Sequence, residues 1–125
     1  EDELMQLIPA IINVGWKKNV NDYLALADVN VFPSKREGLP VNLMESMAMG
    51  VPIIAVDTRG SRDIVKNGKN GILLNDNNVD HIARAMKQMG SDFVLRKKLS
   101  VNAFNERAKF DRQHYIGYQI SYYEN

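Results

Sequence analysis

The chain has 125 residues, of which 45% are hydrophobic, and this suits a single domain with a buried core. Its formal net charge is only +1, which argues against nucleic acid or another extended polyanion as a ligand. The absence of cysteine excludes a disulfide framework and a cysteine-based zinc site, and no apolar run approaches the roughly 20 residues that span a bilayer.

Short apolar runs alternate with helical patterns along the chain. The run at 11–14 predicts a buried strand that ends in a turn at Gly15. Residues 19–28 predict a short helix capped by Asn19 or Asn21. Three more apolar runs predict strands, over residues 29–34, 51–57 and 72–74.

Helical signals separate and follow these strands. Pro40 suits the first turn of a helix that runs to about Met49, and Gly50 is a natural terminator. Residues 59–65 predict a helical turn with Ser61 as its cap. Longer helices are expected over residues 79–89, 91–110 and 111–123, the last capped by Asp111.

The alternation of strand and helix predicts an α/β, doubly wound, Rossmann-like domain. We expect a parallel sheet with helices on both faces and a helical C-terminal end. The whole of 1–125 is interpreted as one domain, and we expect the first strands of that domain to lie on a segment that precedes this one.

The stretch REGLPVNLMESMAMG, residues 36–50, has the pattern of a ligand site. On a helical wheel, apolar side chains cover most of the helix, and Glu45 falls on the only sector with polar content. In a doubly wound sheet the preceding loop lies at the carboxyl ends of the strands, where ligands bind. Gly38 lets a ligand approach the backbone, and Glu37 stands beside it. Alone, this pair of glutamates is better explained as a solvated loop charge and a charge at the rim of a packed helix, because the spacing is common.

Residues 33–74, PSKREGLPVNLMESMAMGVPIIAVDTRGSRDIVKNGKNGILL, resemble the donor-binding half of GT-B glycosyltransferases of family 4, the glycosyl transferases group 1. That family carries two glutamates with seven residues between them, here Glu37 and Glu45. The resemblance extends over roughly residues 11–90. It also includes Pro33, Ser34, Gly38, Leu39, Pro40, Met47, Ala48, Gly50, Pro52, Gly60, Asp63, Ile64, Val65, Asn67, Gly68 and Gly71.

The resemblance implies a role for each matching residue. Glu37 would be the catalytic group, holding the donor sugar as its bond to phosphate breaks, and Glu45 would accept hydrogen bonds from the ribose. The remaining donor-binding positions would contribute mainly backbone amides: Gly38, Leu39, Pro40, Val41, Asn42 and Leu43. The loop of Gly15, Trp16 and Lys17 would lie beside the nucleobase.

The resemblance also implies a retaining reaction with no metal and no other cofactor, and a nucleotide-diphosphate sugar, foremost a UDP-sugar, as donor. Bacterial surface or capsular polysaccharide would be the product. We expect a cytoplasmic protein, with peripheral contact at the inner face of the membrane in its full-length form. The basic residues that clamp the donor phosphates, and the N-terminal acceptor domain, would lie on a preceding segment. This chain alone is therefore expected to bind without turnover.

Two departures from the family pattern are Arg36, where an aromatic residue is common, and Met49, where a small residue is common. A second interpretation is that the chain is a non-catalytic α/β signalling or interaction module. A receiver-like domain of that kind would use Asp57, at the end of a strand, but this chain has no acidic pair after residues 11–14.

Several remaining features have structural interpretations. His81 and His114 lack neighbours that would make a metal site, and residues 75–80 suit a turn and helix cap. The RKKL run at 96–99 is expected to be a solvated helix face, with too little charge by itself for a membrane contact. The stripe of Tyr115, Tyr118 and Tyr122 is expected to pack on its own domain or on the missing one.

Overall fold

The computed structural model describes residues 11–15, 20–35 and 41–110 of the chain. Three parallel strands form the sheet in the order β1–β2–β3, with β1 at Asn30–Phe32, β2 at Ile53–Val56 and β3 at Gly71–Leu74. Ile54 of β2 lies between Val31 and Ile72 in the register. All four residues of β2 are buried, as expected for the middle strand of a covered parallel sheet.

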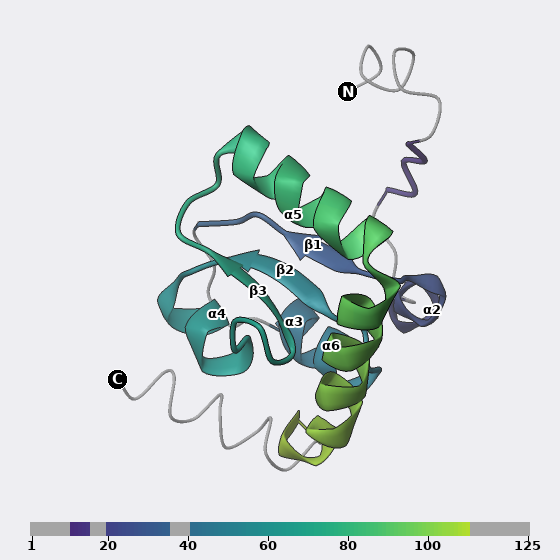
Figure 1. The fold of residues 1–125 in the computed structure, drawn as a ribbon. Coiled ribbons are helices and arrows are strands. Elements are labelled where there is room, and N and C mark those ends of the chain that lie inside the picture. Colours follow the sequence, from purple (N-terminus) through teal and green to yellow (C-terminus); the bar gives the residue numbers. More distant parts are fainter. Residues whose placement is uncertain (1–10, 16–19, 36–40, 111–125) are drawn as a thin grey trace.

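Helices lie on both sides of this sheet (Figure 1). They are α2 (Val20–Leu26), α3 (Val41–Ala48), α4 (Arg59–Ile64), α5 (Val79–Ser91) and α6 (Phe93–Asn105), with a 3-10 turn, η1, at Arg107–Phe110. The predicted strands at 29–34, 51–57 and 72–74 and the predicted helices at 40–49, 59–65 and 79–89 are all present with shifted ends.

The strand side chains divide between two hydrophobic clusters because successive residues of a strand point to opposite faces. Ile53 and Ala55 pack with the buried residues of α3 and α4. Ile54 packs on the other face with Ala85 and Met89 of α5. The predicted α/β, Rossmann-like architecture with helices on both faces is therefore confirmed.

Helix α6 joins the two layers at the amino ends of the strands. Its Leu99 belongs to the cluster under α5, whereas its Ala103 belongs to the cluster under α3. Ser100 Oγ donates a 2.7 Å hydrogen bond to the carbonyl of Gly50, in the turn between α3 and β2. This turn needs glycine because Gly50 has a φ of +71°, which confirms its predicted role as helix terminator.

The predicted strand at 11–14 is wrong. Residues 11–15 have no regular secondary structure, and Ile12 is largely exposed. Figure 1 shows this segment apart from the sheet. An apolar run becomes a strand only when the edge of another strand pairs with it, and none of the three described strands does so.

Two predicted caps differ from the structure, and a third lies outside the described residues. Asn21 lies inside α2, which begins at Val20, and Asn19 lies outside the described residues. Helix α4 is capped by Thr58, whose side chain accepts from the Ser61 amide, so Ser61 is the third helical residue of a capping box. Thr58 and Ser61 both carry a hydroxyl group, so the sequence alone could not show which of them caps the helix.

The long helix predicted at 91–110 is also different. Ser91 ends α5, and Asp92 caps α6, with its Oδ1 2.9 Å from the Leu95 amide nitrogen. Helix α6 ends at Asn105, and the chain continues as η1. The helix predicted at 111–123, its cap Asp111, and His114 and the three tyrosines lie outside the described residues.

No helix among the described residues is long and apolar enough to cross a membrane. The same part of the chain holds no cluster of three or more histidine or acidic side chains that could bind a metal ion.

Candidate functional site

The carboxyl ends of the three strands meet at one edge of the sheet. The segments that follow them contain Pro33 to Lys35 after β1, Asp57 and Thr58 after β2, and residues 75–78 after β3. The Asp57 amide donates to the Leu74 carbonyl at 2.6 Å, which holds the β2 and β3 segments together. Ligands of open α/β sheets bind outside this edge.

Helix α3 presents one carboxylate near this edge. Leu43, Met44 and Met47 are buried in the core, so Leu43 could meet a ligand only through its backbone. Val41 and Asn42 in the first turn, and Glu45 one turn further on, are partly exposed. No described residue donates a hydrogen bond to the Glu45 carboxylate. The side chain is therefore available for hydroxyl groups of a ligand.

Two hydrogen bonds fix α3 on the sheet. Near the start of the helix, Asn42 Oδ1 accepts from Asn30 Nδ2 at 2.8 Å. Near its end, the fully buried Ser46 donates from Oγ to the Val51 carbonyl at 2.8 Å. Glu45 lies between these two anchors, so its position is set by the packing of the whole helix.

Charged pairs line the neighbouring segments. Arg62 Nε lies 2.9 Å from Asp57 Oδ1, and His81 Nδ1 lies 2.8 Å from Asp76 Oδ1. The hydrogen bond from His81, and next the one from the Asn78 amide, lower the pKa of Asp76; the positive charge of Lys35 adds to this effect. The charge of Lys35, in the segment after β1, therefore affects the pKa of Asp76, in the segment after β3.

The sequence interpretation missed both pairs. The available signal was that each aspartate comes just after an apolar parallel strand: Asp57 directly follows β2, and Asp76 follows β3 after one intervening residue. The partners Arg62 and His81 both lie five residues further along the chain, on the helix that follows. His81 is exposed, in agreement with the prediction that it is a structural or exposed side chain.

Most of the predicted site cannot be placed. Glu37, Gly38, Leu39 and Pro40, and Trp16 and Lys17 of the nucleobase loop, lie outside the described residues. Gly15 is described: its amide donates to Asn13 Oδ1, and its φ of +67° suits glycine. The structure does not bring Gly15 to α3, because residues 11–15 lie apart from the sheet (Figure 1).

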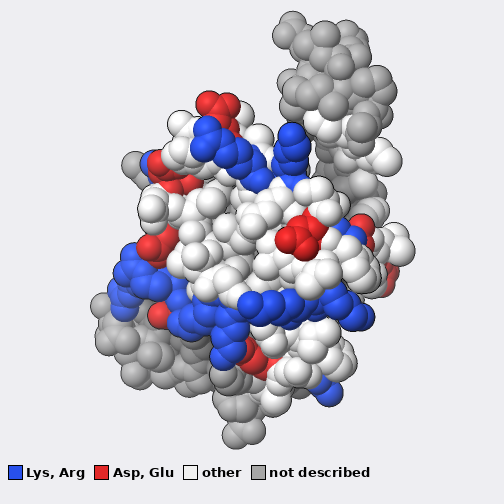
Figure 2. Space-filling view, in the orientation of Figure 1, with Lys and Arg blue, Asp and Glu red and all other residues white. Residues whose placement is uncertain are grey.

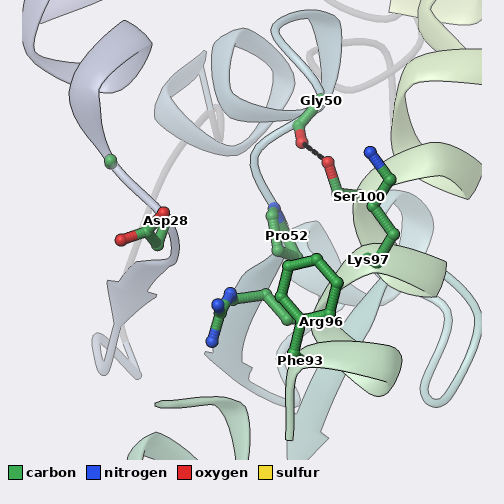
Figure 3. A pocket seen from close by; sticks show the side chains of 8 residues that line it. Asp28, Gly50, Pro52, Phe93, Arg96, Lys97 and Ser100 are labelled. Atoms are coloured by element: carbon green, nitrogen blue, oxygen red, sulfur yellow. Dashed lines mark hydrogen bonds between the residues drawn. The ribbon is translucent and has the colours of Figure 1, made fainter.

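A hollow of about 170 Å³ lies at the opposite edge of the sheet (Figure 3). Asp28, just before β1, lies on one side of it, and Phe93, Arg96 and Lys97 of α6 lie on the other. Pro52, just before β2, forms part of the wall. Because these residues precede the strands, the hollow belongs to the amino edge and is separate from the candidate site.

The open parallel sheet, with α3 and its carboxylate at the carboxyl edge, defines an α/β domain of the Rossmann-like class. Residues 5–106 match the family described as glycosyl transferases group 1. The chain belongs to this family, and the resemblance of residues 33–74 to the glycosyl transferases group 1 is confirmed.

Relatives in this family are bacterial glycosyltransferases. The chain is 31% identical over 115 residues to the UDP-Gal:alpha-D-GlcNAc-diphosphoundecaprenol alpha-1,3-galactosyltransferase of Escherichia coli, covering 86% of this chain and 30% of that protein. It is 31% identical over 93 residues to the capsular polysaccharide biosynthesis glycosyltransferase CapM of Staphylococcus aureus, covering 72% of this chain and 24% of that one. The chain thus spans less than a third of either relative.

A solved structure confirms the fold. Anabaena HepE in complex with UDP and glucose superimposes with a TM-score of 0.80 at 19% identity, covering 98% of this chain and 33% of that one. At this level of sequence identity, the similarity is evidence for the fold alone.

Proposed function

We propose that this chain forms the donor side of a glycosyltransferase, binding a nucleotide-diphosphate sugar at the carboxyl edge of its sheet. We assign a UDP-sugar as the donor, a retaining reaction without a metal, and a bacterial surface or capsular polysaccharide as the product. The protein would work at the cytoplasmic side of the membrane. The names of the E. coli and S. aureus relatives support a UDP-sugar donor and a polysaccharide product, and the UDP bound to HepE, which has the same fold, agrees with that donor.

The carboxylate of Glu45 carries this proposal. Burial of a charge is costly unless a partner compensates for it. Glu45 is half-buried on an otherwise apolar helix, and no described residue donates to it. Two ribose hydroxyls would supply the missing donors, because a carboxylate accepts hydrogen bonds through both oxygens.

The neighbouring backbone would bind the phosphates. The first amides of α3, at Val41, Asn42 and Leu43, have no acceptor within the helix and point to its N-terminal side. Such amides favour an anion. Glu37, eight residues before Glu45 in the chain, would then contact the sugar and stabilise the charge that develops as the glycosidic bond breaks.

The competing interpretation, a receiver-like module that uses Asp57, has less support. Arg62 Nε occupies one oxygen of this carboxylate at 2.9 Å, and the family match explains the surrounding residues. The donor-binding function is therefore the better supported of the two.

The test is a titration of the isotope-labelled chain with UDP, GDP and ADP, followed by backbone-amide NMR. We expect shifts centred on residues 38–45 with UDP, and a loss of affinity of about tenfold or more in Glu45→Gln, because a hydrogen bond to a charged group contributes about 1.5–3 kcal/mol. Asp28→Asn, at the opposite edge of the sheet, is the matched control. Shifts that persist unchanged in Glu45→Gln, or a folded chain that binds none of the three nucleotides, would count against the proposed site.

A further inference from the structure

We propose that the outer face of α6 binds the surface of a membrane that contains anionic lipid. We define this outer face by its four exposed apolar residues and its two exposed lysines. They are Phe93, Val94, Lys97, Lys98, Val101 and Phe104. The proposal concerns the amino edge of the sheet and does not rest on the nucleotide site.

Helix α6 is apolar on two sides. Its inner side contributes Leu99 and Ala103 to the two hydrophobic clusters. On the outer face, Phe93 is 66% exposed, Val94 77%, Val101 43% and Phe104 48%. Gly50 and Arg107 cover part of Phe104, but each of the four side chains keeps at least 43% of its surface exposed. Isolated exposed apolar residues are common, but four on one face of a 13-residue helix form a continuous strip.

The charges on α6 are all positive. Arg96, Lys97 and Lys98 lie within the helix, and it contains no acidic residue between Phe93 and Asn105. Arg107, just beyond the helix, has its guanidinium carbon 3.9 Å from the centre of the Phe104 ring. Figure 2 shows a band of lysine and arginine side chains that runs from α4 across to α6.

The nearby acidic side chains offset only part of this charge. Asp92 and Asp28 lie at the Phe93 end, and Asp92 is engaged in capping α6. At the other end Glu106 pairs with Lys69, with Glu106 Oε1 3.0 Å from Lys69 Nζ. The two lysines of the outer face have no acidic partner among the described residues, so their charges are available to an anionic surface.

The combination of the two residue types favours a lipid surface over an acidic protein. Two lysines alone would bind an anionic bilayer weakly, but aromatic and aliphatic side chains beside them can enter the boundary between headgroups and acyl chains. Helix α5 provides a contrast within the chain, because most of its exposed residues are polar or charged. The acceptor named for the E. coli relative, a diphosphoundecaprenol, is itself a lipid that stays in a membrane.

The experiment is flotation of the whole chain with vesicles, without nucleotide. One set of vesicles contains equal parts of phosphatidylcholine and phosphatidylglycerol, and the other contains phosphatidylcholine alone. Three double variants are compared: Lys97→Gln with Lys98→Gln, Phe93→Ser with Val94→Ser, and, as a charge-matched control on α5, Arg84→Gln with Lys87→Gln. All six side chains are exposed, and circular dichroism checks that each variant is folded.

We expect the unmodified chain to bind the anionic vesicles. The lysine variant should bind them about 10- to 30-fold more weakly, since each lysine near such a surface contributes about 1 kcal/mol. The Phe93 and Val94 variant should lose about tenfold, and the α5 control should change less than twofold. Failure to bind anionic vesicles, or an equal loss in the control, would overturn the proposal. Binding to polyglutamate that does not need Phe93 and Val94 would identify an acidic protein as the partner and would also overturn it. Glu45→Gln should bind vesicles normally, which separates this result from the nucleotide test.

Discussion

Asn30 and Asn42 connect the first described strand to the helix that carries the candidate site. Asn30 Nδ2 donates to Asn42 Oδ1 at 2.8 Å, across a separation of twelve residues in the chain. Both side chains are partly buried. Because the bond lies one turn from Glu45, it helps to set the position of that carboxylate relative to the sheet edge.

Removing either asparagine side chain should destabilise the fold. We expect Asn30→Ala and Asn42→Ala each to lower the free energy of unfolding by about 1–2 kcal/mol, because each leaves a partly buried amide group without its partner. Urea denaturation of the two single variants and the double variant measures the coupling between them. A coupling free energy near zero would show that the two side chains act independently and that the hydrogen bond does not hold α3 in place.

The two glutamates should differ in which part of the donor they contact. If Glu45 binds the ribose, Glu45→Gln should weaken binding of UDP and UDP-glucose equally, by about tenfold or more. If Glu37 contacts the sugar, Glu37→Gln should leave UDP affinity unchanged and remove only the additional affinity for UDP-glucose. Isothermal titration or NMR with both ligands makes the comparison. The assignments would be reversed if Glu37→Gln weakened UDP itself.

Two glycines should respond in opposite ways to alanine. A Cβ on Gly71, at the start of β3, would lie 2.4 Å from the Ile53 carbonyl oxygen, whereas a Cβ on Gly90 in α5 would meet nothing within 4 Å. We expect Gly71→Ala to destabilise the chain by at least about 2 kcal/mol, since backbone must move. Gly90→Ala should stabilise it by about 0.5–1 kcal/mol, because alanine favours the helix. Thermal unfolding of both variants tests the register of β2 and β3.

The Asp76 and His81 pair should make a small contribution to the pH dependence of stability. The folded-state pKa of Asp76 is lowered from its ordinary value of 3.8, first of all by the hydrogen bond from His81. The carboxylate therefore adds stability above the ordinary pKa, and this contribution is lost as the pH falls through the lower folded value. His81→Gln should raise the pKa of Asp76, measured by NMR of its side-chain carbonyl carbon. An unchanged pKa would show that the pair does not form in solution.

Much of the fold could be predicted from local pattern. The apolar runs around Ile54 and Ile72 are strands because a middle or covered strand is apolar on both faces. Gly50 ends α3 because few other residues accept its positive φ. The family could be inferred as well, since the glutamates come with a long surrounding stretch that matches it.

The tertiary structure decided which side chains have partners. The sequence shows that Asn42, Ser46 and Glu45 are polar residues on an apolar helix. It does not show that Asn42 bonds to Asn30 and Ser46 to the Val51 carbonyl. Nor does it show that Glu45 has no hydrogen-bond donor among the described residues. Those partners lie on other elements, so no local pattern contains them.

The same reason explains two further features of the structure. The apolar run at 11–14 does not form a strand, because strand formation depends on a neighbouring edge. The outer residues Val94 and Val101 of α6 are exposed because the sheet buries only the inner side of the helix, through Leu99 and Ala103. Residue order thus determined the local preferences of the chain. The packing of distant elements decided which of its apolar and charged groups are buried and which remain available to bind.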